Sequence, residues 1–195
     1  MIIRKLFKFE GSHIVRNCSS DHCKQNIHGH SYIVEVFIHS NKLDRGYMVM
    51  DFILLDKMKW FIESFDHSYS LWNKEKDDFK QFIYTYNKRV AEIPVSPSAE
   101  GYALLFFMVC DAILKNTRFA NGEGNIRLES VRVHETVTGY AEVFREDMDL
   151  LHFSLDDIHF TQGIQEEWKD INWFNQLKAQ LPFINKSVDL EIDTE

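Results

Sequence analysis

The sequence contains little of what would cross-link the chain or divide it into separate parts. Among its 195 residues there are three cysteines, three prolines and eight glycines, and no internal repeat or low-complexity linker is present. This length without a linker predicts one domain, with at most an appendage. The cysteines are few and odd in number, and no signal-like apolar stretch follows the first methionine. We therefore expect reduced thiols and a cytoplasmic protein.

Long hydrophobic runs are also absent, and none approaches the length of a membrane span. Basic residues are outnumbered, with 22 lysines and arginines against 30 aspartates and glutamates. The net charge of -8 argues against a general affinity for nucleic acid or for an anionic membrane. A small anionic substrate remains compatible with this charge, because a local basic pocket can form inside an acidic protein. The apolar share of 45% is that of an ordinary globular chain.

Two segments of alternating apolar and polar residues carry histidines in line with the apolar positions. Residues 2–13 predict a strand whose covered face ends at His13. Residues 28–39 predict a second strand, which places His28 and His30 on one face. If the strands pair antiparallel, the three imidazoles meet, and three neutral imidazoles with an open fourth position are typical of catalytic zinc. Each motif alone has a simpler interpretation, as surface histidines or as a satisfied core histidine.

The stretch that joins these two strands contains two of the three thiols. Residues 14–27 are rich in Asn, Ser and Asp, so a loop is expected, and it carries Cys18, His22 and Cys23. Gly29 lies between the two histidines of the second strand and has no side chain. Backbone or ligand can therefore approach closely at that position.

Two helices with apolar faces are predicted in the middle of the chain. Asp51 is the expected N-cap of a helix that runs to about Ser64. Ser96-Pro97 predicts the start of a second helix that runs to about Asn116. Residues 73–93 are interpreted as a surface helix and loop without chemistry.

Three further acidic positions are candidates for function. Asp66-His67 follows the first helix and is a possible acid–base pair, although a helix-end charge beside a solvated histidine also explains it. Glu100 lies in the first turn of the second helix, where a negative charge suits the helix dipole. Glu135 continues the apolar stripe of a strand predicted over residues 126–135. Either that strand end is exposed, or Glu135 receives hydrogen bonds from a ligand.

The order of these elements predicts an α+β domain. Residues 140–144 return the chain after the strand that ends at Glu135, so hairpins stand at both ends with two helices between them. This pattern favours an antiparallel four-stranded sheet with two helices on one face. A C-terminal helical extension follows, with an amphipathic helix over residues 164–181 and an acidic, mobile tail over residues 186–195.

Read together, these motifs resemble the 6-pyruvoyltetrahydropterin synthase family over about residues 2–145, and within it the bacterial branch that forms 6-carboxytetrahydropterin for queuosine biosynthesis. Each motif alone is weak, but the order is specific. The resemblance leaves residues 146–195 as an extension without an assigned role. The motifs are, in chain order, Ser12-His13, a cysteine before His28-Gly29-His30, Gly46-x-Met48-Val49-x-Asp51-Phe52, Asp66-His67, Ser96-Pro97-Ser98-Ala99-Glu100 and Val133-x-Glu135-Thr136.

The resemblance implies a tunnelling fold, in which subunits close a barrel as a trimer and two trimers stack into a hexamer with active sites between subunits. It implies one zinc ion per subunit and a cysteine as the catalytic base. Cys18 and His22 stay open as alternatives to Cys23. Lys24, Arg16 and Arg132 are candidates to meet the triphosphate. The implied roles are zinc ligands for His13, His28 and His30, catalysis for Cys23, Asp66 and His67, and pterin binding for Glu135 and Glu100.

The implied reaction starts from 7,8-dihydroneopterin triphosphate and releases triphosphate and acetaldehyde to leave 6-carboxy-5,6,7,8-tetrahydropterin. Three alternatives remain at this point. One is the pyruvoyl-forming reaction, in which the side chain is rearranged and kept. The second is a zinc hydrolase, which leaves Cys23 and Glu135 without a function. The third is a zinc-stabilised module that binds a pterin without turnover.

Overall fold

A computed structural model describes residues 1–184 of the chain. The central strands are β1, Ile2–His13, and β2, His28–His39, and both begin and end at the predicted residues. They pair antiparallel over their whole length, so that His13 lies opposite His28 and His30 lies opposite Gly11. The alternation of apolar and polar residues thus predicted both the strands and the face that carries the histidines.

The sheet is larger than predicted and is mixed rather than antiparallel. Its seven strands lie in the order β7-β6-β2-β1-β3-β4-β8. The predicted four-stranded antiparallel sheet is present as β7-β6-β2-β1, but β3 and β4 extend it in parallel and β8 closes that side antiparallel. The added strands are β3 (Ser68–Trp72), β4 (Val90–Ile93) and β8 (His159–Phe160). The predicted strands on the other side are β6 (Arg127–Thr136) and β7 (Gly139–Phe144).

The prediction missed β3 because this strand has no alternating pattern. Its residues from Ser68 to Leu71 are all buried. A strand covered on both faces gives no polar face for the sequence to reveal.

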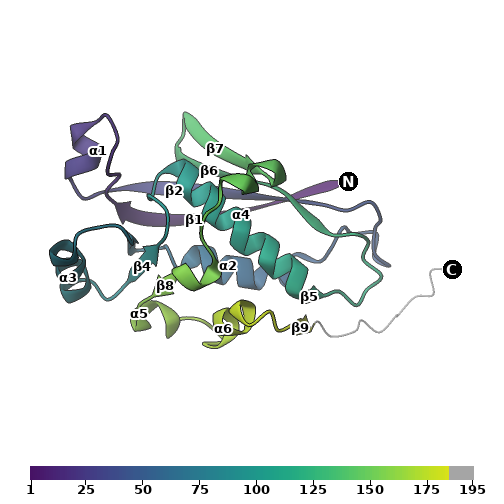
Figure 1. The fold of residues 1–195 in the computed structure, drawn as a ribbon. Coiled ribbons are helices and arrows are strands. Elements are labelled where there is room, and N and C mark those ends of the chain that lie inside the picture. The colour runs from purple at the N-terminus through teal and green to yellow at the C-terminus, as the bar shows by residue number, and fades with distance from the viewer. Residues whose placement is uncertain (185–195) are drawn as a thin grey trace.

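Two helices pack against the sheet on one shared core (Figure 1). A short 3-10 turn, η1, Phe52–Leu55, leads into α2, Asp56–Glu63, and α4 spans Ala99–Asn116. The ring of Phe9 on β1 contacts Phe65, which follows α2, and Phe106 of α4, with ring centroids 5.9 and 6.0 Å apart. Tilted and edge-to-face aromatic contacts of this kind connect both helices to the sheet.

The two predicted helix starts had different outcomes. The Asp51 carboxylate accepts a hydrogen bond from the Ile53 amide, as an N-cap does. The start at Ser96-Pro97 was wrong, because α4 begins at Ala99 and its cap is Ser98, whose hydroxyl accepts from the Gly101 amide. Pro97 therefore precedes the helix, and its carbonyl oxygen is free to bind a side chain.

The segments beside this core are short. The loop of residues 14–27 contains one small helix, α1, Asp21–Gln25. Residues 73–93 include the expected helix as α3, Asp77–Tyr86, but end in strand β4 instead of a loop. Together with β3 and the residue after β1, this segment forms a second small core made of Ile14, Tyr69, Leu71, Ile83 and Val90.

The C-terminal extension belongs to the same fold and is less helical than predicted. The single helix expected over residues 164–181 was wrong. The chain forms α5, Gln162–Gln165, and α6, Trp173–Lys178, because Asp170 between them bonds the Asn172 amide through its side chain. The other elements are the 3-10 turns η2, Arg145–Leu150, and η3, Leu155–Asp157, and a two-stranded sheet of β5, Thr117–Arg118, and β9, Phe183–Ile184.

Side chains of the extension, including Phe160, Trp173 and Leu177, join the main hydrophobic core. In Figure 1 the extension passes alongside α2. The predicted mobile tail lies outside the described residues. Within residues 1–184, no helix has both the length and the apolar character needed to cross a membrane.

Gly29 is a position where the structure predicts a measurable cost for a single methyl group. A Cβ atom there would lie 2.8 Å from the carbonyl oxygen of Gly11, which confirms the expected close approach of backbone. We expect Gly29→Ala to lower the free energy of unfolding by about 1–3 kcal/mol, because two paired strands must shift. Gly139→Ala is the matched control, since its nearest contact at 3.8 Å is ordinary. Equal midpoints in urea for the two variants would contradict this expectation.

Candidate active site

The three predicted histidines lie together at the end of the β1–β2 pair. His13 Nε2 lies 3.1 Å from His28 Nε2, and the ring centroids of the three residues are 4.5 to 5.3 Å apart. One ring nitrogen of each histidine, including His30, lies within 4.8 Å of the others. In residues 1–184 this is the only group of three or more histidine, cysteine or acidic side chains with such a spacing.

Backbone carbonyls determine how two of these rings point. His13 Nδ1 lies 2.5 Å from the carbonyl oxygen of Pro97, and His28 Nδ1 lies 3.0 Å from that of Asn26. Because a carbonyl oxygen only accepts, each Nδ1 carries the proton, and each Nε2 of a neutral ring has a lone pair. Two lone pairs 3.1 Å apart repel each other, and a cation held by both nitrogens removes this repulsion. The donor set therefore fits a metal ion whose imidazole ligands are oriented by carbonyls.

His13 is the buried member of the cluster, and none of its surface is exposed to solvent. Burial is the main cause that lowers the pKa of His13 to about 4. The neighbouring His28 and His30 lower the pKa further, whereas the hydrogen bond to Pro97 raises it. The ring is thus neutral near pH 7, which keeps its Nε2 lone pair available to a ligand.

Tyr32 and Glu135 complete the polar surroundings of the cluster. The Tyr32 hydroxyl lies 3.1 Å from His13 Nδ1 and donates a hydrogen bond to Glu135 Oε1 at 3.4 Å. Glu135 Oε1 also lies 3.8 Å from His13 Nε2 and 3.9 Å from His30 Nε2. Burial is the main cause that raises the pKa of Tyr32 far above the usual tyrosine value, so its hydroxyl keeps its proton. This tyrosine orients the Glu135 carboxylate, a role that the sequence did not predict.

A cavity of about 520 Å³ opens beside the histidine cluster. Loop residues, strand ends and the start of α4 all contribute to its wall, so side chains distant in sequence surround one space of the size that holds a small molecule. The candidate site residues in this wall are Cys18, Cys23, His28, His30, Glu100 and Glu135.

The two thiols in this wall differ in their hydrogen bonds. Cys18 donates its Sγ–H to the carbonyl oxygen of Ser20 at 3.3 Å. No such bond to the described residues is found for Cys23, whose backbone carbonyl is instead held by the Val15 amide at 3.1 Å. Cys23 is therefore the thiol that is free to react, on a backbone that is tied to the end of β1.

Arg16 supports the loop that carries Cys23. Its Nη1 donates to the Lys24 carbonyl at 2.8 Å, and its Nε donates to Glu75 Oε1 at 2.7 Å. The guanidinium lies over the ring of Phe79, 5.2 Å from its centroid. The segment around α3, to which the sequence assigned no chemistry, thus holds the thiol loop in place.

The three cations named as triphosphate candidates all form ion pairs within the chain. Arg16 pairs with Glu75, as described, and Lys24 Nζ lies 2.8 Å from Asp21 Oδ1. Arg132 binds two carboxylates on the open face of the sheet, those of Glu142 at 2.9 Å and Glu35 at 3.2 Å. None of the three lines the cavity beside the histidines.

Asp66 and His67 lie apart from that cavity. The two side chains do touch, with Asp66 Oδ2 2.8 Å from His67 Nδ1, and Asp66 Oδ1 accepts from the Glu10 amide at 2.7 Å. They line a different cavity of about 440 Å³, which shares no residue with the cavity beside the histidines. A third cavity of about 430 Å³ is lined by both His30 and His67. The pair is therefore outside the cavity that the other candidate residues share, although His67 borders the strand that carries His30.

Known proteins resemble this chain along most of its length. A family model described as 6-pyruvoyl tetrahydropterin synthase matches residues 2–146. A Helicobacter pylori J99 protein named 6-carboxy-5,6,7,8-tetrahydropterin synthase is 48% identical over 182 residues, covering 91% of both chains. A protein of the same name from Aquifex aeolicus is 32% identical and covers 74% of this chain and 98% of its own.

Solved structures show the same fold at low sequence identity. A protein of Wolinella succinogenes superposes with a TM-score of 0.57 at 20% identity, covering 74% of this chain and 98% of its own. The 6-pyruvoyl tetrahydropterin synthase of Plasmodium vivax superposes with a TM-score of 0.53 at 19% identity over the same shares. With the family model and the relatives above, this leads to one conclusion: the chain belongs to the 6-pyruvoyl tetrahydropterin synthase family.

Proposed function

We propose that the chain is a cytoplasmic, zinc-dependent lyase that converts 7,8-dihydroneopterin triphosphate into 6-carboxy-5,6,7,8-tetrahydropterin, acetaldehyde and triphosphate in queuosine biosynthesis. The observation that carries the proposal is the cavity lined by two of the three clustered histidines, two thiols and two carboxylates. Family membership supports a pterin substrate, and the names of the relatives support the carboxylated product.

His13, His28 and His30 are proposed to hold the zinc ion, since one ring nitrogen of each lies within 4.8 Å of the others. When bound, zinc supplies Lewis-acid polarisation of substrate oxygens, which makes neighbouring protons more acidic. The fixed hydrogen bonds from His13 to Pro97 and from His28 to Asn26 keep the rings in the tautomer that can bind it.

Cys23 is proposed as the base that accepts a proton from the substrate side chain, in its thiolate form. Glu135 is proposed to bind the pterin ring, because a carboxylate pairs with two adjacent N–H donors. The hydrogen bond from Tyr32 supports this role, since it fixes the direction of the Glu135 carboxylate. Glu100, at the start of α4 in the same wall, is proposed to contact the same ring.

Asp66 and His67 are proposed to act in the cavity of a neighbouring copy. Their contact at 2.8 Å is suited to proton handling, and neither residue lines the cavity beside the histidines of its own chain. The proposed assembly is the homohexamer, as a dimer of trimers, implied by the resemblance.

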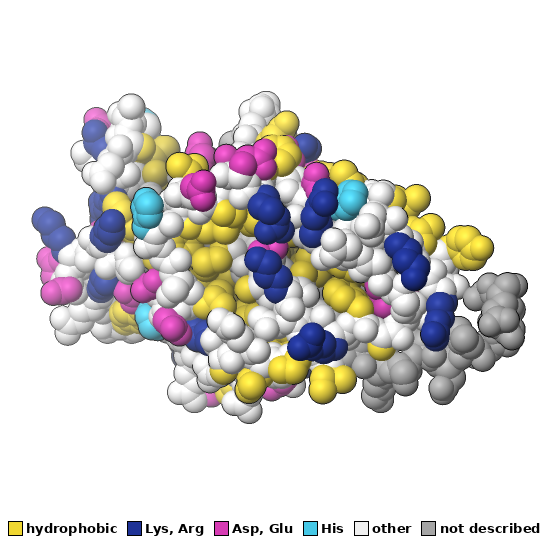
Figure 2. Space-filling model, turned by 45° about the vertical axis from the view of Figure 1, so that its right-hand side comes forward, with side chains coloured by type: hydrophobic (Ala, Val, Ile, Leu, Met, Phe, Trp, Pro, Cys, Tyr) yellow, Lys and Arg dark blue, Asp and Glu magenta, His cyan; other side chains and the backbone are white. Residues whose placement is uncertain are grey.

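The edge of the sheet supports such an assembly. Strand β7 is the last strand on its side, so its outer hydrogen-bonding groups have no neighbour within the described sheet. Tyr140 and Phe144 of this strand are 55% and 40% exposed, and Val137 in the turn before it is 96% exposed. Figure 2 shows apolar side chains at the surface of one face, among basic and acidic ones. Exposed apolar groups along an open edge are typical of an interface.

Product analysis tests the reaction directly. Purified protein loaded with zinc is incubated with 7,8-dihydroneopterin triphosphate, and the products are separated by chromatography and mass spectrometry. Acetaldehyde together with the 6-carboxy product supports the proposal. Release of triphosphate with retention of the side chain assigns the pyruvoyl-forming reaction instead. Binding without any product supports the non-catalytic alternative.

Glu135→Gln is expected to raise the KM for this substrate about 10- to 100-fold, because the neutral amide loses a charge-assisted pair of hydrogen bonds to the ring. Steady-state kinetics and metal analysis are the measurements. Glu129→Gln on the same strand is the control, since Glu129 does not line the cavity. An unchanged KM removes the pterin contact. Loss of the metal would assign Glu135, whose Oε1 lies within 4 Å of two histidines, to the metal instead.

A further inference from the structure

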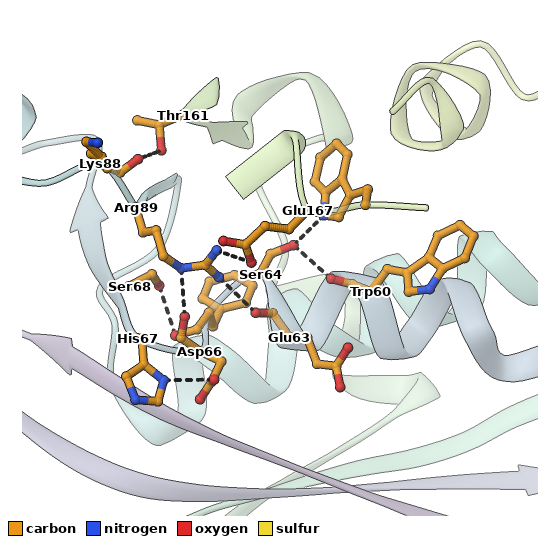
Figure 3. A network of polar contacts seen from close by, with 12 residues as sticks. Trp60, Glu63, Ser64, Asp66, His67, Ser68, Lys88, Arg89, Thr161 and Glu167 are labelled. Carbon is orange, nitrogen blue, oxygen red and sulfur yellow. Dashed lines mark hydrogen bonds and ion pairs between the residues drawn. The ribbon is translucent and has the colours of Figure 1, made fainter. Parts of the chain in front are cut away.

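The turn that carries Asp66 and His67 is held from outside by one arginine (Figure 3). Arg89 precedes β4, and its Nε donates to the Asp66 carbonyl at 3.0 Å while its Nη2 donates to the Glu63 carbonyl at 3.2 Å. Glu63 is the last residue of α2, where a cation is favoured by the helix dipole, and Asp66 lies in the turn that follows. The same turn places His67 in the left-handed region, with φ at 49°, which only surrounding contacts can maintain.

The C-terminal extension provides the partner of this arginine. Glu167 Oε2 lies 2.5 Å from Arg89 Nη1, and both side chains line the cavity that contains Asp66 and His67. The next residue, Trp168, donates its indole N–H to Ser64 Oγ at 2.9 Å, and Ser64 immediately follows α2. Of these two consecutive residues of the extension, Glu167 pairs with the arginine that binds the turn, and Trp168 bonds Ser64 at the start of the turn.

This part of the extension is itself firmly attached. Thr161 exchanges backbone and side-chain hydrogen bonds with Val90 and donates its hydroxyl to the Lys88 carbonyl at 2.7 Å. A Cβ atom on Gly163 would lie 2.6 Å from that same carbonyl, so the extension packs directly on the residues that flank Arg89. Strand β8 adds two ladder pairs with β4.

We propose that residues 159–168 of the extension are a brace that positions the Asp66–His67 pair, with Glu167 as the positioning residue that orients Arg89. Glu167 touches neither Asp66 nor His67 and acts through the guanidinium, which in turn holds the Asp66 carbonyl. This inference rests on the proposed catalytic role of Asp66 and His67. It gives the C-terminal extension, which lies beyond the residues matched by the family model, a function in the reaction.

The expected size of the effect follows from exposure. The Glu167 side chain is 64% exposed, which limits the strength of the ion pair, whereas the Arg89 side chain is only 19% exposed. The indole bond of Trp168 remains when Glu167 is changed. Changing Glu167 should therefore loosen the turn without unfolding it. The expected result is a moderate loss of turnover, since catalytic groups are sensitive to small misplacements.

Glu167→Gln tests the brace, with Glu166→Gln as the matched control. Glu166 is the adjacent residue, and its side chain accepts from Gln162 within the extension and does not contact the turn. The measurements are hydrogen exchange by mass spectrometry, zinc content, and kcat and KM. In Glu167→Gln we expect faster exchange confined to peptides over residues 8–11 and 64–69, with kcat lower by about fivefold at unchanged KM and zinc content. Glu166→Gln should match the wild type in all of these.

Two further variants test the mechanism of the brace. Glu167→Asp keeps the carboxylate and should restore part of the kcat. Arg89→Lys keeps the charge but loses the fork that reaches both carbonyls, so its kcat should fall at least as far as that of Glu167→Gln.

The inference is overturned if the exchange and kcat of Glu167→Gln equal those of Glu166→Gln, or if exchange rises throughout the protein and indicates general destabilisation. Exchange is measured without substrate. A wild-type protein that forms no product would therefore count against the proposed function, while the local exchange result would still decide whether the brace exists.

Discussion

Cys23→Ala is expected to lower kcat by about 10²- to 10⁴-fold without changing the zinc content, because the proposed proton acceptor is removed and the proposed histidine ligands are not. The small helix that carries Cys23 is held by one backbone hydrogen bond from Val15 and by the Arg16 hydrogen bond to the Lys24 carbonyl. Alanine leaves these bonds in place, so the loop should keep its conformation. Steady-state kinetics and metal analysis on the same preparation measure the two expectations.

Cys18→Ala is the matched control, since both thiols line the same cavity. The Cys18 thiol is bonded to the Ser20 carbonyl, so its loss should change turnover by less than about threefold. The opposite result, with Cys18→Ala inactive and Cys23→Ala near the wild-type rate, would transfer the role of base to Cys18. Near wild-type rates in both variants would mean that neither thiol takes the proton.

His28→Ala is expected to weaken zinc binding by more than about 100-fold and to abolish turnover as a result. Loss of a direct ligand exceeds the 10- to 100-fold effect typical of residues that only support a ligand. His28 is half-buried and its Nε2 faces that of His13, so alanine also leaves His13 without its counterpart. Zinc stoichiometry after dialysis and circular dichroism together distinguish loss of metal from loss of fold.

His22→Ala provides the control for this experiment. His22 lies in the short helix α1 and is not part of the three-histidine cluster, so its variant should bind zinc as the wild type does. Full zinc occupancy in His28→Ala, or loss of zinc in His22→Ala, would show that the ligand set is different from the one proposed.

The elements that position the three-histidine cluster could be predicted because they depend on local patterns. In a strand with one covered face, apolar and polar side chains alternate with a period of two residues. This alternation predicted the first and last residues of β1 and β2, and it placed His13, His28 and His30 on the same face. Tyr32 continues that stripe, so the sequence held a signal for it. Its hydrogen bond to Glu135 depends on a strand about a hundred residues further along the chain, and no local pattern reports such a contact.

Other features had no local signal. Strand β3 is covered on both faces, and the cap of α4 lies two residues after the predicted one because Ser98 rather than Ser96 bonds the first turn. The carbonyl of Pro97 orients His13 only because the fold brings residues 84 positions apart into contact.

The sequence by itself determined the two histidine strands, the family and the candidate residues, since these follow from alternation, spacing and motif order. Only the tertiary structure decided that Asp66 and His67 stand apart from their own chain's cavity and that Glu167 and Arg89 support them. The physical reason is that such contacts join segments distant along the chain. Their energy comes from how those segments pack, which no short stretch of sequence encodes.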